Sequence, residues 1–341
     1  MNLPMATVAS PQAERPLSPE EIAELQSEVR ALARERDAVI LAHNYQLPEI
    51  QDVADFVGDS LALSQQATRT DQPVIAFCGV HFMAETASIL CPDKTVLIPD
   101  LRAGCSLADS ITPDELRAWQ AKHPGAITVM YVNTTAEIKA LTDYCVTSSN
   151  AVSVVRHILA EHGEDTEILF GPDMFLGAYV EKSIGVGGGR FHVWNGECHV
   201  HAGIRPGDIS DVRARHPGAD FLIHPECGCS TSVMEYVASG DIDAEGVHML
   251  STGGMVQYAK QATPGSTVVM ATETGMLHQL QVAAPDVDWI AANRAAVCRY
   301  MKMITLPKLR DALRDLAPEV KVPADIAERA RVPIERMVAI A

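Results

Sequence analysis

Three stretches of the chain share one order of polar and apolar positions, beginning with a capped amphipathic helix. SPEE at Ser18 combines an N-cap serine, a proline at the first helical position and a glutamate three residues after the cap, which together predict a helix start. TPDE at Thr112 repeats this combination, and DISDVRARHPG from Asp208 predicts a third, weaker helix. Apolar residues at helical spacing follow the first start, so three helices of one kind are expected.

A short apolar run that enters polar residues follows each predicted helix. The three runs are AVILAHNYQ from Ala38, AITVMYVNT from Ala126 and ADFLIHPEC from Ala219. Alignment on the first alanine gives two polar columns, two residues apart: His43, Tyr131 and His224, then Tyr45, Asn133 and Glu226. Because alternate residues of a strand point to the same face, each unit should aim two polar side chains from one strand end.

Downstream, each unit offers a hydroxyl at a second predicted helix start and then ends on a cysteine. The hydroxyls are those of Ser60, Ser148 and Thr252, and the cysteines are Cys105, Cys198 and Cys298. Free backbone N–H groups at a helix N-terminus suit phosphate or carboxylate oxygens, although each hydroxyl could instead be an ordinary helix cap. Second apolar runs, VIAFCGVHF, EILFGPDMF and TVVMATETG, lie between the hydroxyl and the cysteine.

The repeat predicts an α/β fold of three similar α/β/α layered domains with short parallel sheets. The cysteines are 93 and 100 residues apart, which is too long for a solenoid of short repeats. With one polar edge from each, the units should meet around a pseudo-threefold axis with the active site at the centre. The expected division is a flexible tail over 1–17, units over 18–110, 111–205 and 206–299, and a segment over 300–341 packed with the first unit.

Composition narrows the class of ligand. The chain has 341 residues, is 47% hydrophobic and carries a formal net charge of −17, so it can bury a large core but lacks the cationic excess that binds nucleic acid or anionic membranes. No apolar run reaches the length of a membrane span, and the first residues lack the pattern of a signal peptide. A cytoplasmic protein without nucleic-acid or membrane partners is expected.

Eight cysteines are too sparse for a disulfide scaffold, and a reducing compartment would keep them as thiols. Three lie in apolar segments and should be small buried hydrophobes: Cys78, Cys91 and Cys145. Cys227 and Cys229 are not placed by any pattern. If the units converge, so do the three aligned cysteines, and three sulfur ligands suit zinc or an iron–sulfur cluster. Repeated core positions are the alternative for these three.

Beyond this, the chain from about Ser18 to its end resembles the quinolinate synthase family. The resemblance rests on AHNYQ with DVADFVGDS, MYVNTTAEIKA with DYCVTSSNA, WNGECHVH, HPEC, LSTGGM, and ETGMLHQL with CRYMKMITLPKL, in that order. It implies three α/β domains around a central [4Fe-4S] cluster whose fourth iron is open to substrate. The ligands that it implies are the three aligned cysteines, Cys105, Cys198 and Cys298.

The resemblance also implies an activity in NAD biosynthesis: condensation of iminoaspartate with dihydroxyacetone phosphate to quinolinate, with release of phosphate and water. The open iron would act as a Lewis acid, and L-aspartate oxidase, as the source of iminoaspartate, is a candidate partner. The implied catalytic residues are Glu226, Tyr131, Tyr45, His201 and His224. The implied substrate-binding residues are His43, Ser60, Tyr131, Asn133, Ser148, His224, Glu226 and Thr252.

The chain departs from the family pattern at two places. Residues 173–176 read Asp-Met-Phe-Leu where many members have Asp-Lys-Asn-Leu, so this loop offers no lysine to anions. Cys298 is also a lone cysteine, without the Cys-x-x-Cys-x-x-Cys cluster of some relatives, which removes a regulatory disulfide but keeps the cluster ligand.

Three other functions remain as alternatives. A zinc-dependent hydrolase or lyase would use Cys198 with His199 or His201, and it leaves the other two aligned cysteines without a role. GVGGGR at Gly185 could suggest a dinucleotide site, but it follows a helix-like segment and fits a helix-ending glycine turn better. A non-catalytic iron–sulfur sensor would not need the titratable residues gathered around the predicted ligands.

Overall fold

The computed structural model describes residues 16–185, 189–239 and 245–340, and within them helices and strands alternate in three units. The first unit contains α1 (Pro19–Glu35), β1 (Ala38–His43), α2 (Pro48–Gln51), β2 (Phe56–Gly58), α3 (Ser60–Arg69), β3 (Val74–Cys78), α4 (His81–Leu90) and β4 (Thr95–Leu97). The second contains a 3-10 turn (Ala108–Ser110), α5 (Pro113–Lys122), β5 (Ile127–Tyr131), α6 (Ala136–Lys139), β6 (Tyr144–Val146), α7 (Ala151–His162), β7 (Ile168–Gly171), α8 (Met174–Ile184) and β8 (Phe191–Val193). The third contains α9 (Pro206–Arg215), β9 (Asp220–Ile223), α10 (Ser230–Ser239), β10 (Val247–Met249), α11 (Thr252–Ala259), β11 (Thr267–Ala271), α12 (Met276–Ala283) and β12 (Asp288–Ala291). A 3-10 turn (Met301–Met303), α13 (Leu306–Asp315) and α14 (Ala324–Ala339) complete the chain.

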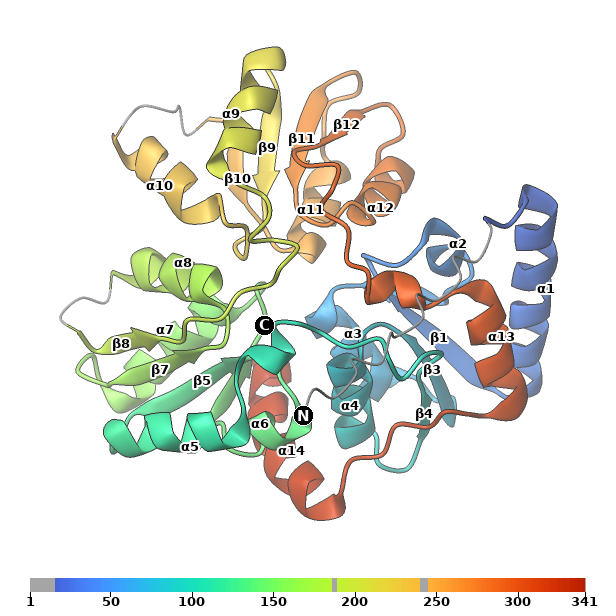
Figure 1. Ribbon diagram of the computed structural model, residues 1–341, viewed down its shortest axis with the longest axis horizontal. Coiled ribbons are helices and arrows are strands. Elements are labelled where there is room, and N and C mark those ends of the chain that lie inside the picture. The colour runs from blue at the N-terminus through green and yellow to red at the C-terminus, as the bar shows by residue number, and fades with distance from the viewer. Residues whose placement is uncertain (1–15, 186–188, 240–244, 341) are drawn as a thin grey trace, which may run out of the picture.

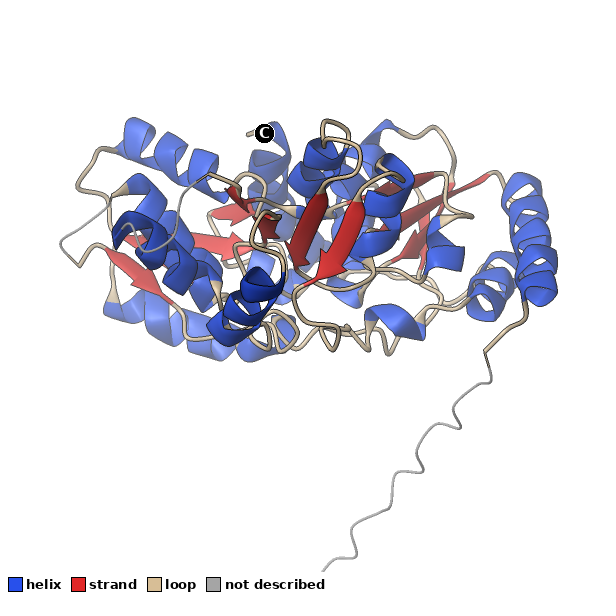
Figure 2. Ribbon diagram, turned by 90° about the horizontal axis from the view of Figure 1, so that it is seen from above, coloured by secondary structure: helices blue, strands red, loops and turns tan. Residues whose placement is uncertain are grey.

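The three sheets have the same strand order. They read β2-β1-β3-β4, β6-β5-β7-β8 and β10-β9-β11-β12, and neighbouring strands pair in parallel in all three sheets. The predicted fold class, three similar α/β units with short parallel sheets, is therefore confirmed. Figure 1 shows the units grouped around a common centre, and Figure 2 shows helices on both sides of the strands. The pseudo-threefold axis stays a prediction.

Local interactions repeat between units as well. The predicted capping boxes of Ser18 and Thr112 are both present. In the first unit the carboxylate of Asp55 accepts a hydrogen bond from the backbone N–H of Ile40, at 2.8 Å. In the second, Asp143 accepts from Thr128 at the same distance. Asp55 directly precedes β2 and Asp143 directly precedes β6, so each hydrogen bond joins an edge strand to its neighbour, β1 or β5.

The segment after the third unit joins the first unit to the second. α13 packs on α1 and β3, whereas α14 contacts α3 and α4 and also α6 and β6. Asn150, which is buried at the start of α7, holds the end of α14: its Nδ2 donates to the carbonyl oxygens of Met337 (2.9 Å) and Ile340 (2.7 Å). Its Oδ1 accepts from the backbone N–H of Thr147 at 2.8 Å. The end of the chain is thus tied to the loop that carries Ser148.

Two stretches that the sequence singled out lie partly outside the described residues. Residues 1–15 of the predicted tail and 186–188 of GVGGGR are not described. Gly185, which is described, ends α8 with a φ of 74°, the helix-ending glycine turn that the sequence predicts. Among the helices of the described ranges, none combines the length and the apolar character needed to span a membrane.

Replacing Asn150 with Ala should lower the free energy of unfolding by about 2–3 kcal/mol, because the buried carbonyl of Met337 and the buried N–H of Thr147 lose their hydrogen bonds. Thermal and denaturant unfolding measure the change. Ser210→Ala is the control, since the Ser210 hydroxyl is exposed and bonds only within α9. Equal stability of Asn150→Ala and wild type would contradict this account of α14.

Candidate functional site

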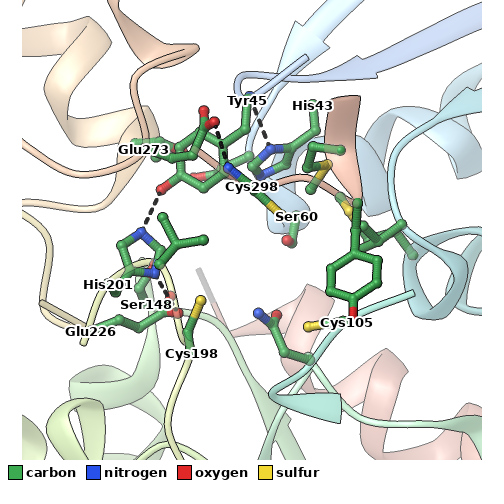
Figure 3. A pocket seen from close by; sticks show the side chains of 18 of the residues that line it. His43, Tyr45, Ser60, Cys105, Ser148, Cys198, His201, Glu226, Glu273 and Cys298 are labelled. Carbon is green, nitrogen blue, oxygen red and sulfur yellow. Dashed lines mark hydrogen bonds and ion pairs between the residues drawn. The ribbon is translucent and has the colours of Figure 1, made fainter. Parts of the chain in front are cut away.

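A pocket lies where the carboxyl ends of the three sheets meet (Figure 3). Every residue predicted for the site lines it: His43, Tyr45, Ser60, Cys105, Tyr131, Asn133, Ser148, Cys198, His201, His224, Glu226, Thr252 and Cys298. The structure thus brings together residues that are up to 255 positions apart in the chain, from His43 to Cys298. Their individual roles stay predictions.

The first polar column sits at the strand-order switch of each sheet. His43 and Tyr131 are the last residues of β1 and β5, and His224 directly follows β9. In each sheet the second and third strands pair on opposite sides of the first strand. Their connections therefore diverge, and a crevice opens at the carboxyl end of the first strand.

The second column corrects one expectation, that Glu226 shares a strand face with His224. β9 ends at Ile223, so both residues lie in the turn beyond it. A local hydrogen bond brings them together instead: the backbone N–H of Glu226 donates to Nδ1 of His224, at 3.3 Å. The N–H of Tyr45 donates in the same way to Nδ1 of His43, at 3.1 Å.

These bonds determine what the two histidines can do. An Nδ1 that accepts a backbone N–H carries no proton, so the neutral ring has its proton on Nε2. Burial lowers the pKa of His43 to about 3 and that of His224 to about 4, so both rings are neutral at physiological pH. Nε2 of His224 lies 3.3 Å from the hydroxyl of Ser148. Both rings can therefore offer an N–H donor to an anionic ligand.

Glu226 stands at the centre of a buried charged group. Its Oε2 lies 3.3 Å from Nδ1 of His201, and its Oε1 accepts a hydrogen bond from the hydroxyl of Tyr131. Burial by itself would raise the pKa of Glu226, but His201 and His224 outweigh it and hold the pKa below the usual value. Burial likewise opposes protonation of His201, yet neighbouring Tyr45, Cys198 and Glu226 raise its pKa. Each of His201 and Glu226 thus favours the charged form of the other.

Thr272 extends this group and was not predicted. It directly follows β11 and is buried, and its hydroxyl lies 2.5 Å from the Tyr45 hydroxyl and 3.0 Å from Nε2 of His201. Burial raises the pKa of Tyr45, which therefore stays a protonated phenol. The signal in the sequence was the polar ending of TVVMATETG, the second apolar run of its unit.

The three aligned cysteines come from equivalent loops, after β4, β8 and β12. All are free and half-buried, and Figure 3 shows their side chains around one pocket. Burial raises the pKa of Cys105, and the nearby Cys198 and Cys298 raise it further. Three thiols so close would resist ionisation unless a metal supplied the compensating positive charge.

The loop of Cys298 is held by a buried acid. Glu273 is fully buried, and its carboxylate accepts from the backbone N–H of Cys298 (2.9 Å) and of Gly275 (2.7 Å). Nζ of Lys302 pairs with Glu273 at 3.0 Å and also donates to the carbonyl of Tyr45. A Cβ at Gly275 would lie 2.8 Å from the backbone carbonyl oxygen of Tyr45, so the close approach of these two backbone segments favours glycine there.

The loop of Cys198 depends on close backbone approach. Gly196 pairs with Asp173, whose buried carboxylate caps α8 by accepting from Leu176 at 2.8 Å. A Cβ at Gly196 would lie 2.5 Å from the carbonyl of Pro172 and 2.5 Å from the Ser110 hydroxyl. Gly196 is therefore required for the loop of Cys198 to pack this closely against Pro172 and Ser110.

The three hydroxyls are not equivalent. Ser60 and Thr252 are the first residues of α3 and α11, each preceded by a capping side chain, Asp59 and Ser251. The prediction that Ser148 begins a helix is wrong: α7 begins at Ala151 after its N-cap Asn150. The reason is that Thr147–Asn150 forms a capping turn, with the Asn150 side chain bonded to Thr147.

The pocket lining also includes His199, a candidate ligand of the zinc alternative, and Ser106, which no sequence pattern indicates. Nδ1 of His199 lies 2.6 Å from the Ser106 hydroxyl. The His199 ring also meets Tyr300 edge-on, with centroids 6.0 Å apart. In addition Oδ1 of Asn133 is buried and finds no hydrogen-bond partner among the described residues, which suits a group that awaits a ligand.

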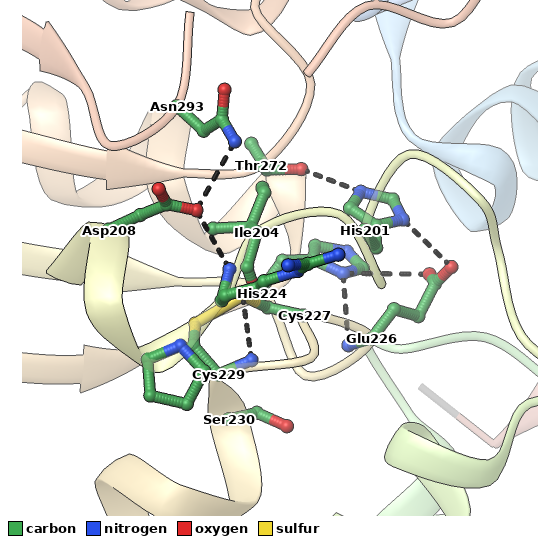
Figure 4. Close-up of a disulfide and its surroundings, with 12 residues drawn as sticks. His201, Ile204, Asp208, His224, Glu226, Cys227, Cys229, Ser230, Thr272 and Asn293 are labelled. Carbon is green, nitrogen blue, oxygen red and sulfur yellow. Dashed lines mark hydrogen bonds and ion pairs between the residues drawn. A yellow bond between two sulfur atoms is a disulfide. The ribbon is translucent and has the colours of Figure 1, made fainter. Parts of the chain in front are cut away.

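A disulfide corrects the expectation that every cysteine is a thiol. Cys227 and Cys229 are joined directly after Glu226 (Figure 4), because the turn there brings their Cα atoms to 5.1 Å and their sulfurs into bonding contact. Both residues are buried. The free thiols Cys78, Cys91 and Cys145 are buried in the core, as expected.

Comparison with known proteins gives consistent matches. The model of the family described as Quinolinate synthetase A protein matches residues 27–339. A protein of Mycobacterium tuberculosis (strain ATCC 25618 / H37Rv) named quinolinate synthase is 57% identical over 92% of this chain and 88% of its own length. The protein of that name from Mycobacterium sp. (strain KMS) is 56% identical over 92% of this chain and 91% of its own.

Gly196→Ala should lower the free energy of unfolding by roughly 1–3 kcal/mol, because the added methyl group must displace the backbone of Pro172. Gly207→Ala is the matched control, since a Cβ at Gly207 meets nothing within 4 Å. Denaturant unfolding of both variants measures the difference. A stability loss no larger than that of Gly207→Ala would refute the close approach.

Proposed function

The chain belongs to the quinolinate synthetase A family, and on this premise we propose that it is a quinolinate synthase. In the proposed reaction, iminoaspartate and dihydroxyacetone phosphate condense to quinolinate, with release of phosphate and water, as a step of NAD biosynthesis. L-aspartate oxidase is the proposed source of iminoaspartate.

One observation carries the proposal: Cys105, Cys198 and Cys298, from equivalent loops of three units, line one pocket with the aligned polar columns. A [4Fe-4S] cluster takes one thiolate per iron, so three thiols around a pocket fit it and leave one iron without a protein ligand. That iron would supply Lewis-acid activation of a substrate oxygen. The raised pKa of Cys105 fits thiols that need a metal to ionise.

The residues of this chain would hold the acidic substrates by hydrogen bonds rather than by surface charge. The Nε2–H groups of His43 and His224 are donors at the pocket wall, and the amide of Asn133 can turn its NH₂ group toward a carboxylate. Ser60 and Thr252 begin α3 and α11, where free N–H groups favour carboxylate or phosphate oxygens. This local binding suits a chain of net charge −17.

Proton transfer is proposed for the group around Glu226. Its carboxylate can take a proton from a substrate carbon or hydroxyl and return one during dehydration, while Tyr131 and His201 stabilise the anion between those steps. Tyr45 reaches the same group through Thr272. Low dielectric at this buried position makes each contact stronger than it would be in water.

A second candidate, a zinc-dependent hydrolase or lyase, is favoured by one observation. Ligand atoms of Cys198, His201 and Glu226 all lie within 4.8 Å of one another, a spacing that could hold a single ion. That function would give Cys105 and Cys298 no role. Metal analysis separates the two, because the cluster contains iron and sulfide and the hydrolase contains zinc.

Anaerobically purified protein should be brown, with about four irons and four sulfides per chain. Each of three Ala variants should lose the cluster, since two thiolates cannot retain it: Cys105→Ala, Cys198→Ala and Cys298→Ala. Iron and sulfide assays measure the loss. Four variants should keep the cluster and serve as controls: Cys78→Ala, Cys145→Ala, Cys227→Ala and Cys229→Ala. Colourless, zinc-loaded and active wild-type protein would end this proposal.

Glu226→Gln should reduce turnover by about 10² to 10⁴, because the amide keeps the shape of the carboxylate but cannot take a proton. Cluster content and substrate affinity should change much less. Steady-state kinetics on protein with assayed iron measures both. Undiminished turnover in a cluster-replete variant would remove Glu226 from proton transfer, and loss of the cluster would make its role structural.

A further inference from the structure

A second group of metal-ligating side chains lies at the outer edge of the second sheet. It consists of His123, Glu167 and His192, here called the edge triad. Nδ1 of His123 and Nε2 of His192 each lie 2.7 Å from the same oxygen, Oε1 of Glu167. One ligand atom from each residue lies within 4.8 Å of the other two. His123 and Glu167 precede β5 and β7, and His192 is the second residue of β8, so the triad lies at the amino ends of these strands, opposite to the pocket.

Backbone hydrogen bonds hold the three residues in fixed register. The N–H of Ile127, the first residue of β5, donates to the carbonyl of Glu167 at 2.8 Å. His192 lies within β8 and is paired with Leu169 of β7. His123 ends α5, and its carbonyl accepts from the N–H of Ala126 at 3.1 Å. Two donors therefore come from neighbouring strands and the third from the turn that leads into β5, all held by backbone hydrogen bonds, which favours a preformed site.

The donor set matches first-row transition metals. Two imidazole nitrogens and one carboxylate oxygen are typical ligands of zinc, with water in the remaining position. The side chains of His123, Glu167 and His192 are 23%, 36% and 27% exposed, so an ion can enter from solvent. The hydrogen bond from His123 lowers the pKa of Glu167, which keeps the carboxylate ionised and available as a ligand.

The two imidazole rings are tilted by 45° to each other, with centroids 4.1 Å apart, and one nitrogen of each faces the same carboxylate oxygen. Arg190, two residues before His192, is paired with Asp165 at 2.5 Å, so its charge is already balanced by an acid. The simpler reading is a purely structural pair of imidazole–carboxylate hydrogen bonds.

We propose that the edge triad is a site for a divalent first-row metal ion, zinc in the first instance, separate from the pocket. A bound ion would tie the turn between α5 and β5 to β8. The loop that carries Cys198 continues directly from β8, so the ion would stabilise the strand from which that loop departs. The proposal rests on the triad alone and does not depend on the reaction proposed for the pocket.

The test is a zinc titration of anaerobically purified protein with its pocket metal in place, by calorimetry and by thermal unfolding. Wild type should bind one additional zinc ion per chain, and its Tm should rise by several degrees and return on addition of a chelator. His123→Gln and His192→Gln should each weaken binding at least tenfold and remove the Tm rise. Their Tm without zinc shows whether they are folded.

His157→Gln is the matched control. Nε2 of His157 faces Glu161 at 3.3 Å on the surface of α7, so this variant also removes a histidine–carboxylate contact from the same unit. It should bind zinc as wild type does. Zinc binding that survives both triad variants, or that is lost in Cys198→Ala instead, would overturn the proposal, the latter because it assigns the ion to the pocket. A zinc-independent Tm in wild type would leave only structural hydrogen bonds.

Discussion

Parallel pairing in one strand order, used three times, is the constraint on which the rest of this structure depends. In a parallel sheet all carboxyl ends lie at one edge, and the order in which the second and third strands flank the first opens a crevice at the end of the first. His43, Tyr131 and His224 occupy that position in their units. Three such edges turned toward one centre make a pocket that no single unit could form.

That centre holds a buried histidine–carboxylate pair, His201 and Glu226, that further hydrogen bonds stabilise. Glu226 is 2% exposed and His201 3%, and an isolated charge at such depth would neutralise by a shift of its pKa. Here the carboxylate contacts His201 and Tyr131, and His201 contacts Thr272. Since removal of one partner would leave another unpaired, the group is better regarded as one unit than as separate residues.

The two histidines of the first column show how backbone geometry selects chemistry. In His43 and His224 the backbone N–H of the residue two positions later donates to Nδ1, so the ring proton is on Nε2. Burial lowers the pKa of both rings and keeps them neutral. Nδ1 of His201 has no such backbone bond and lies 3.3 Å from Glu226, and Tyr45, Cys198 and Glu226 together raise the pKa of His201. Residues of one type thus differ in pKa because burial dominates for two of them and neighbouring acidic groups dominate for the third.

The sequence by itself determined the repeat, the α/β class and a set of residues that line one pocket, because caps, apolar runs and the residues that end them are local signals that recur in register. The sequence could not predict the Thr272–His201 contact or the Ser106–His199 contact, because each joins a hydroxyl and a histidine from segments that are distant in the chain and meet only in the folded protein. It also misplaced Ser148 relative to α7 and put Glu226 on a strand, because the ends of elements are decided by side chain–backbone bonds such as that of Asn150 to Thr147. The sequence did not predict the Cys227–Cys229 disulfide for the same reason. Two thiols can bond only if the turn between them brings their sulfurs together, and the conformation of that turn is decided by tertiary packing and not by composition.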